Sequence, residues 1–83
     1  MDIEAQVRKY ILENFMYTDD ESRLTPELSL LDNNIVDSTG VLEMVGFLEE
    51  TFNIKVDDTE LVPDNFDSLA KLTSYIQKKM TGA

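Results

Sequence analysis

Ser38 is the residue whose type and position most clearly suggest chemistry. It follows Asp37 and opens an acidic stretch, residues 38–52, in which apolar residues recur at helical spacing. The first turn of a helix presents unpaired backbone N–H groups and the positive end of the helix dipole, and both favour an anion. A phosphodiester joined to the Ser38 hydroxyl would therefore be well placed, so Ser38 is a candidate for covalent modification.

A plainer interpretation is that Asp37 or Ser38 only caps the helix, since both side chains are favoured in that role. A second such pair, Asp67-Ser68, also precedes a predicted helix. The two pairs differ in the helix that each one opens. Ser68 leads into a lysine-bearing helix. Ser38 leads into an acidic helix in which we expect the side chains of Met44 and Phe47 to be half-exposed. Only the Ser38 helix offers a surface on which a basic partner could dock while it handles a group on the serine.

Composition argues against an enzyme. The 83 residues include no cysteine and no histidine, which removes the thiol nucleophile, the usual zinc ligands and the commonest general base. Hydrolysis by paired carboxylates is disfavoured for Glu49-Glu50, because adjacent helical residues point apart. The acidic runs 19–21 and 57–60 lack the alternating oxygen ligands and central glycine of a calcium loop, so we expect no metal.

The net charge of −10 limits the partners. Nucleic acid and anionic membrane surfaces would repel the chain, whereas basic protein surfaces would attract it. The start of the chain has neither a basic lead nor a long apolar run, so we expect no signal peptide, no membrane span and a cytoplasmic location. A chain of this length predicts one domain over residues 1–83, and we expect a monomer.

The hydrophobic pattern predicts an all-α fold, a small bundle of three main helices with one or two short helical turns. The main helices are expected over residues 2–16, 38–52 and about 67–80, and short turns near 57–61 and 63–66. The connection 17–36 is long but carries several leucines, so it should pack across the helices. The inner faces are expected to carry Ile3, Val7, Tyr10, Ile11 and Phe15, then Val41, Val45, Leu48 and Phe52, and finally Leu69, Leu72 and Ile76, with Tyr75 and Met80 at the edges.

Taken together, these residues resemble the acyl carrier proteins, a family of phosphopantetheine-binding carriers. The resemblance spans most of the chain and rests on Leu31-Asp32, Asp37-Ser38, Leu42-Glu43, Leu48-Glu49-Glu50, Phe52, Ile54 and Val56. It implies an acyl-carrier-protein-like bundle with 4′-phosphopantetheine esterified to Ser38. It further implies that Asp37 belongs to the motif read by a phosphopantetheinyl transferase. Glu43, Glu49 and Glu50 match the acidic face that partner enzymes with basic docking surfaces recognise, and Met44 and Phe47 are candidate apolar contacts beside it.

The chain also departs from the family pattern. Thr39 stands where leucine is usual, Ile35 where glycine is frequent, and Gly46 and Phe47 differ in size from the usual residues. These differences favour a specialised carrier over the housekeeping one. The cargo stays open between an acyl and an aminoacyl or peptidyl thioester, delivered to acyl- or aminoacyl-handling enzymes. An unmodified acidic interaction module with the same fold is the alternative to a carrier.

Overall fold

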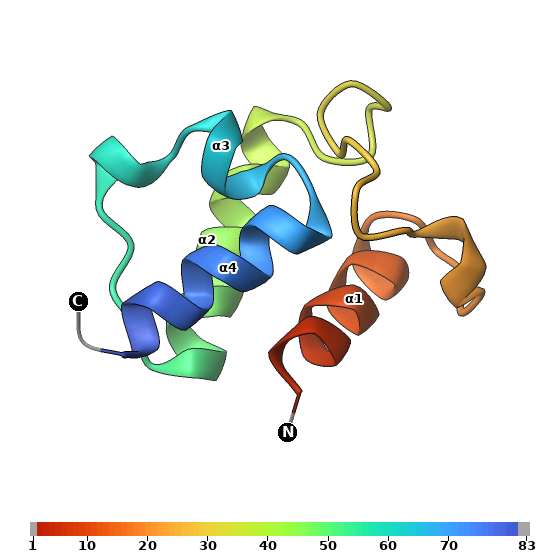
Figure 1. Ribbon diagram of the computed structural model, residues 1–83. Coiled ribbons are helices and arrows are strands. Elements are labelled where there is room, and N and C mark those ends of the chain that lie inside the picture. Colours follow the sequence, from red (N-terminus) through yellow and green to blue (C-terminus); the bar gives the residue numbers. More distant parts are fainter. Residues whose placement is uncertain (1, 82–83) are drawn as a thin grey trace.

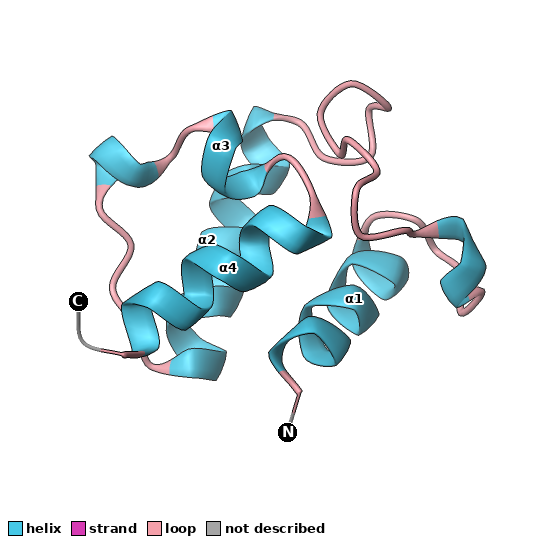
Figure 2. Cartoon of the chain, viewed as in Figure 1, coloured by secondary structure: helices cyan, strands magenta, loops and turns pink. Residues whose placement is uncertain are grey.

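Helices and loops account for the whole described chain, residues 2–81 of the computed structural model (Figure 2). The α-helices are α1 (Ile3–Asn14), α2 (Ser38–Phe52), α3 (Pro63–Phe66) and α4 (Leu69–Met80). Two short 3-10 turns, η1 (Glu21–Arg23) and η2 (Asp58–Glu60), lie in the connections. The expected all-α class is confirmed, and the three long helices begin and end within about two residues of the expected bounds.

Each long helix begins where a short polar side chain can accept a hydrogen bond from the first turn. Asp2 accepts from the backbone N–H of Glu4, Asp37 from that of Gly40, and Ser68 from that of Lys71. Such bonds satisfy donors that the helix itself leaves unpaired. Helix α2 is followed by Asn53, whose left-handed backbone (φ 55°, ψ 45°) turns the chain away from the helix axis.

Helix α4 lies across the middle of the molecule and packs against α1 and α3, with α2 behind it (Figure 1). Its buried residues include Leu69, Leu72 and Ile76, as expected. Tyr75, which we expected at the edge, is only 5% exposed because its ring packs against Phe66. The long connection contributes Leu24 and Leu30 to the same core, so it does pack across the helices.

The inner face of α2 differs from the expected one. Gly40, Met44, Leu48 and Phe52 are buried, whereas Val41 and Val45 lie at the margin of the core. Gly40 is buried because the ring of Phe15 packs where its side chain would be. A Cβ at position 40 would lie 2.9 Å from Phe15 Cε1 and 3.1 Å from Val36 Cγ1. The close approach of the end of α1 therefore sets which face of α2 turns inward.

Helix α1 also differs from the expected pattern in detail. Val7 and Ile11 are fully buried, and Leu12 joins them at 3% exposure, although it was not among the expected inner residues. Ile3, Tyr10 and Phe15 are only partly buried. The ring of Tyr10 stacks on that of Phe47, with centroids 3.9 Å apart and planes at 12°, and this stack joins the outer edges of α1 and α2.

Candidate functional site

Ser38 is exposed and is the first residue of α2. The cap is supplied by Asp37 instead, whose Oδ1 accepts the backbone N–H of Gly40 at 2.7 Å. The Ser38 hydroxyl makes no hydrogen bond within residues 2–81 and faces solvent at the positive end of the helix. This arrangement separates the two roles that the sequence left open, because Asp37 caps the helix and the Ser38 oxygen stays available.

The second Asp-Ser pair has the opposite arrangement. Ser68 is 5% exposed, and its Oγ accepts the backbone N–H of Lys71 at 3.1 Å as the cap of α4. The neighbouring Asp67 carboxylate accepts hydrogen bonds from the long connection. Ser68 is therefore a structural cap, and the preference for Ser38 on grounds of context agrees with the exposure of both residues.

An apolar groove of about 410 Å³ opens beside Ser38, between the first turns of α2 and the segment that runs through α3. It is lined by Leu31, Ser38, Val41, Leu42, Leu61, Val62, Pro63 and Phe66. Leu42 is 63% exposed and Val62 40% exposed, so two large apolar side chains of the groove are open to solvent. The Ser38 hydroxyl thus lies at the rim of an apolar hollow, which suits a long flexible group whose ends differ in polarity.

Glu60 fixes the position of Leu61 and Val62, which line the groove opposite α2. Its Oε1 accepts hydrogen bonds from the Tyr75 hydroxyl at 2.9 Å, the Lys79 ammonium at 3.0 Å and the backbone N–H of Asp57 at 3.0 Å. The Asp57 N–H and the Lys79 ammonium hold the pKa of Glu60 below its usual range, and burial raises the pKa of Tyr75. This cluster ties η2, and with it Leu61 and Val62, to α4.

The predicted partner-binding residues divide into three groups. Glu43 and Glu50 are exposed on α2, as the acidic face requires. Glu49 is half-buried, and its Oε2 accepts the backbone N–H of Val56 at 2.8 Å. Phe47 is half-buried against Tyr10 and lies away from the groove.

The expected exposure of Met44 is wrong, since its side chain is completely buried. Met44 lies on the same helical face as Gly40 and Leu48 and fills the space between α2 and the rest of the core. The exposed apolar residue of α2 is instead Leu42, one helical turn after Ser38. The i, i+4 spacing from Ser38 is the sequence signal that could have identified it.

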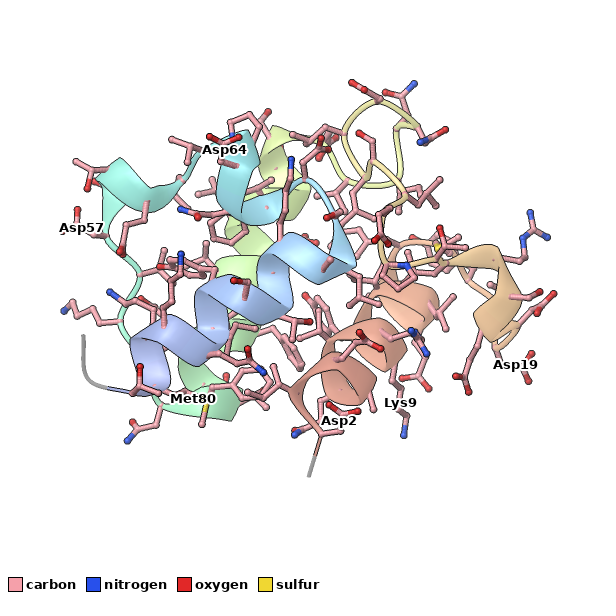
Figure 3. All side chains as sticks on the ribbon, in the orientation of Figure 1. Asp2, Lys9, Asp19, Asp57, Asp64 and Met80 are labelled. Carbon is pink, nitrogen blue, oxygen red and sulfur yellow. The ribbon has the colours of Figure 1, made fainter. Side chains whose placement is uncertain are left out.

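The acidic segments have no cation site among the described residues. Within residues 2–81, no three carboxylate side chains are arranged to hold a metal ion. Figure 3 shows Asp19, Asp57 and Asp64 at separate edges of the molecule, with their side chains turned outward. None of the helices in this part of the chain is both long and apolar enough to cross a bilayer.

A small helical domain with one exposed serine at a helix start, an apolar groove beside it and an acidic helix face has the architecture of a carrier protein. Comparisons with known proteins agree. The chain is 34% identical over 79 residues to an acyl carrier protein of Desulforapulum autotrophicum, covering 95% of this chain and 99% of that one. It is 36% identical over 61 residues to an acyl carrier protein of Thermotoga maritima, covering 74% and 73% of the two chains.

A D-alanyl carrier protein of Streptococcus pyogenes is 30% identical over 74 residues, covering 87% of this chain and 92% of its own. Among solved structures, the solution NMR structure of a holo acyl carrier protein from Nitrosomonas europaea superposes with a TM-score of 0.80. It is 28% identical and covers 98% of this chain. No family model matches the sequence.

The chain belongs to the acyl carrier protein family. Its role is that of a carrier protein, a class of protein that delivers a bound group to partner enzymes. The cofactor of this family is 4′-phosphopantetheine, and the Nitrosomonas europaea neighbour is in its holo form. An exposed hydroxyl beside an apolar groove fits such an arm, because the hydroxyl can be esterified and the groove can contact the apolar part of the arm or its cargo.

Proposed function

We propose that the Ser38 hydroxyl is the attachment site of 4′-phosphopantetheine, and that the chain carries an acyl group as a thioester on this arm. The observation that carries the proposal is the division of roles at the start of α2. Asp37 caps the helix, which leaves the exposed Ser38 oxygen free at the end that favours a phosphodiester. The Asp37 side chain thereby fixes the first turn in which a transferase would meet Ser38.

The rest of the chain is chemically suited to a thioester. The thiol would come from the arm, and the chain itself has no cysteine or histidine to attack or hydrolyse the cargo. A tethered cargo also has a high effective concentration at any enzyme on which the carrier docks.

Intact-mass measurement tests the attachment. Wild-type protein produced with a phosphopantetheinyl transferase should gain the mass of one phosphopantetheine group, and Ser38→Ala should gain nothing. Ser68→Ala is the matched control, because it removes the other Asp-Ser hydroxyl and should still be modified. No gain in the wild type, or a gain that survives in Ser38→Ala, would contradict the proposal and favour the unmodified interaction module.

The cargo has two candidates. An acyl group is favoured by the acyl carrier protein relatives and by the apolar lining of the groove. An aminoacyl group is the second candidate, because D-alanyl carrier proteins are also among the relatives. The mass of the holo protein purified from its host, with the thioester intact, distinguishes the two. A cargo mass that contains an amino acid would exclude a simple fatty acyl group.

We further propose that partner enzymes dock on the face of α2 that carries Leu42, Glu43 and Glu50. Leu42 offers an exposed apolar contact next to Ser38, and the two carboxylates are exposed on the neighbouring side of the same helix. Complementary charge raises the rate of encounter more than it raises the final affinity. Glu43→Lys with Glu50→Lys should therefore lower kcat/KM of the transferase by about tenfold at low salt.

Glu13→Lys with Asp19→Lys is the matched control for this docking face. Both residues are exposed, so the pair makes the same charge change at the end of α1 and before η1. Asp19 lies at the edge of the molecule far from α3 (Figure 3). Equal losses of kcat/KM in both double variants would show that only net charge matters, and would contradict a specific docking face.

A further inference from the structure

Most hydrogen bonds between the connection that leads to Ser38 and the start of α4 are made by Asp67; one more joins the Ala70 N–H to the Pro26 carbonyl at 3.0 Å. The Asp67 Oδ1 accepts the Ser29 hydroxyl at 2.7 Å and the backbone N–H of Leu31 at 3.0 Å. The backbone carbonyl of Asp67 accepts the N–H of Leu30 at 2.6 Å. Three successive residues of the connection thus bond to a single residue of the α3–α4 junction.

These bonds continue toward the modification site. The carbonyl of Leu30 accepts the backbone N–H groups of Ile35 at 2.9 Å and Val36 at 3.1 Å. Leu30 and Val36 are both buried, so this turn is also fixed by packing. Val36 is followed directly by Asp37 and Ser38, which means that a short hydrogen-bonded path runs from Asp67 to the start of α2.

Asp67 also joins two walls of the groove. Leu31, whose N–H it accepts, lines the groove on the side of the connection. Phe66, the residue immediately before Asp67, lines it from α3 and is 2% exposed. The position of one wall relative to the other therefore depends on the Asp67 bonds.

We propose that Asp67 is a positioning residue for the modification site, because its carboxylate holds the turn at Leu30 and Leu31 against α4 and so places both Ser38 and the groove walls. The inference rests on the proposed role of Ser38. The Ser29 hydroxyl and the Leu31 N–H also hold the pKa of Asp67 below its usual range, so the side chain is an ionised acceptor at neutral pH. Asp67 itself does not need to touch the arm.

The kinetic test compares Asp67→Ala with Asp67→Asn as substrates of a phosphopantetheinyl transferase. Asp67→Ala removes both hydrogen bonds of the carboxylate and should raise KM by about tenfold with kcat little changed, because the turn that precedes Ser38 is then less well fixed. Asp67→Asn should recover most of this loss, because the amide oxygen can still accept from Ser29 and Leu31. Asp58→Ala, which removes an exposed charge from η2, should match the wild type.

A destabilised control separates positioning from folding. Leu12→Val weakens the core from α1, which contributes nothing to the groove lining. At a temperature where both proteins are folded, Leu12→Val should keep the wild-type KM while Asp67→Ala does not. An unchanged KM in Asp67→Ala, or an equal rise in Leu12→Val, would overturn the inference.

A second measurement needs no arm and so separates this inference from the proposed function. In nitrogen–proton correlation spectra of the unmodified protein, Asp67→Ala should move the backbone amide signals of Leu31, Val36 and Ser38. The signals of α1 residues such as Val7 should stay in place. Unmoved signals at Leu31 and Ser38 would overturn the positioning role, whereas a wild-type protein that is never modified would overturn only the role of Ser38.

Discussion

Two apolar residues of α2, only two positions apart, have opposite environments. Leu42 is 63% exposed beside Ser38, whereas Met44 is completely buried. Residues two apart on a helix point in nearly opposite directions, so one faces the partner side and the other faces the core. The pair therefore allows surface recognition and core packing to be tested separately within one turn of the same helix.

Leu42→Asn should lower kcat/KM of the transferase and leave the free energy of unfolding nearly unchanged, since an exposed side chain contributes little to the core. Met44→Ala should instead lower the free energy of unfolding by about 2–5 kcal/mol, because it leaves a cavity. Urea unfolding and transferase kinetics on both variants check this prediction. Loss of stability in Leu42→Asn would mean that its side chain packs in the groove.

Glu43 and Glu49 form a second contrasting pair on this helix. Both were expected on the acidic partner face, but Glu49 also accepts the backbone N–H of Val56 and so closes the connection after α2. Glu49→Lys should lower the free energy of unfolding by about 1 kcal/mol, because that N–H loses its partner. Glu43→Lys should leave the free energy of unfolding unchanged within error. Equal unfolding midpoints in urea for the two variants would contradict the structural role of Glu49.

The position of Ser38 at the start of an acidic helix was predictable from sequence, and the composition of the surface around it was only partly so. Asp37-Ser38 before an acidic helix is a pattern of neighbouring residues, so it can be recognised without knowledge of the tertiary structure. The exposure of Leu42 and the burial of Met44 depend on which face of α2 meets α1. That choice follows from the contact of Phe15 with Gly40, and a glycine adds nothing to a hydrophobic pattern.

At the level of elements, the two glycines of α2 have different reasons to be present. Gly40 is in close contact with Phe15 and Val36, whereas a Cβ at Gly46 would meet nothing within 4 Å. Glycine in a helix interior costs about 0.5–1 kcal/mol relative to alanine. Glycine at position 40 is therefore required by close packing, whereas glycine at position 46 lowers helix stability without a packing contact that requires it.

Gly46→Ala should raise the free energy of unfolding by about 0.5–1 kcal/mol. Gly40→Ala should not, because the new methyl group must displace the Phe15 ring and Val36, at a cost of about 1–3 kcal/mol that cancels or exceeds the helical gain. Thermal and urea unfolding of the two single variants give the comparison. A stabilised Gly40→Ala would mean that the end of α1 moves freely away from α2.

The number and order of the three long helices were predictable, because the capping residues Asp2, Asp37 and Ser68 and the helical spacing agree with each other at each start, whereas the short turn η1 was not expected. The role of the connection was predictable only in outline. Its leucines indicated packing, and Leu24 and Leu30 are buried. Its bonds to Asp67 join residues far apart in sequence, and no local pattern encodes such a pairing.

At the level of the whole molecule, two carboxylates bind segments that are distant in sequence. Asp67 joins the long connection to α4, and Glu60 joins η2 to the far end of α4 through Tyr75 and Lys79. The pKa of each carboxylate is lowered in the folded state, by the Ser29 and Leu31 donors for Asp67 and by the Asp57 N–H and Lys79 for Glu60. Their ionised forms are therefore the ones that support the fold.

A lowered folded-state pKa adds stability above the unfolded value, about 4 for these groups, and this stability is lost as the pH falls through the folded value. Urea unfolding of the wild type at several pH values should thus lose stability below about pH 4 relative to a Glu60→Gln, Asp67→Asn double variant. Relief of overall charge repulsion on acidification affects both proteins alike, so it cancels in the difference. A constant difference across the acidic range would contradict the role of the two carboxylates.

The net charge of −10 has opposite consequences for folding and for partner encounter. Repulsion among the acidic residues opposes the compact state, while the ion pairs Arg8–Glu4, Arg8–Glu21 and Lys79–Glu60 support it. These pairs involve only a few of the 17 acidic residues, so repulsion should dominate. Salt screens both effects, with a Debye length of about 10 Å at 0.1 M.

Raising sodium chloride from about 20 mM to about 500 mM should therefore raise the urea midpoint of the free protein and lower kcat/KM of its transferase about tenfold. The Glu43→Lys, Glu50→Lys double variant should keep most of the salt effect on stability and lose most of the effect on kcat/KM, because only the docking face governs encounter. If instead salt lowered the urea midpoint, the ion pairs would outweigh the repulsion. If the double variant kept the wild-type salt dependence of kcat/KM, the attraction would come from the charge of the whole molecule and not from one face of α2.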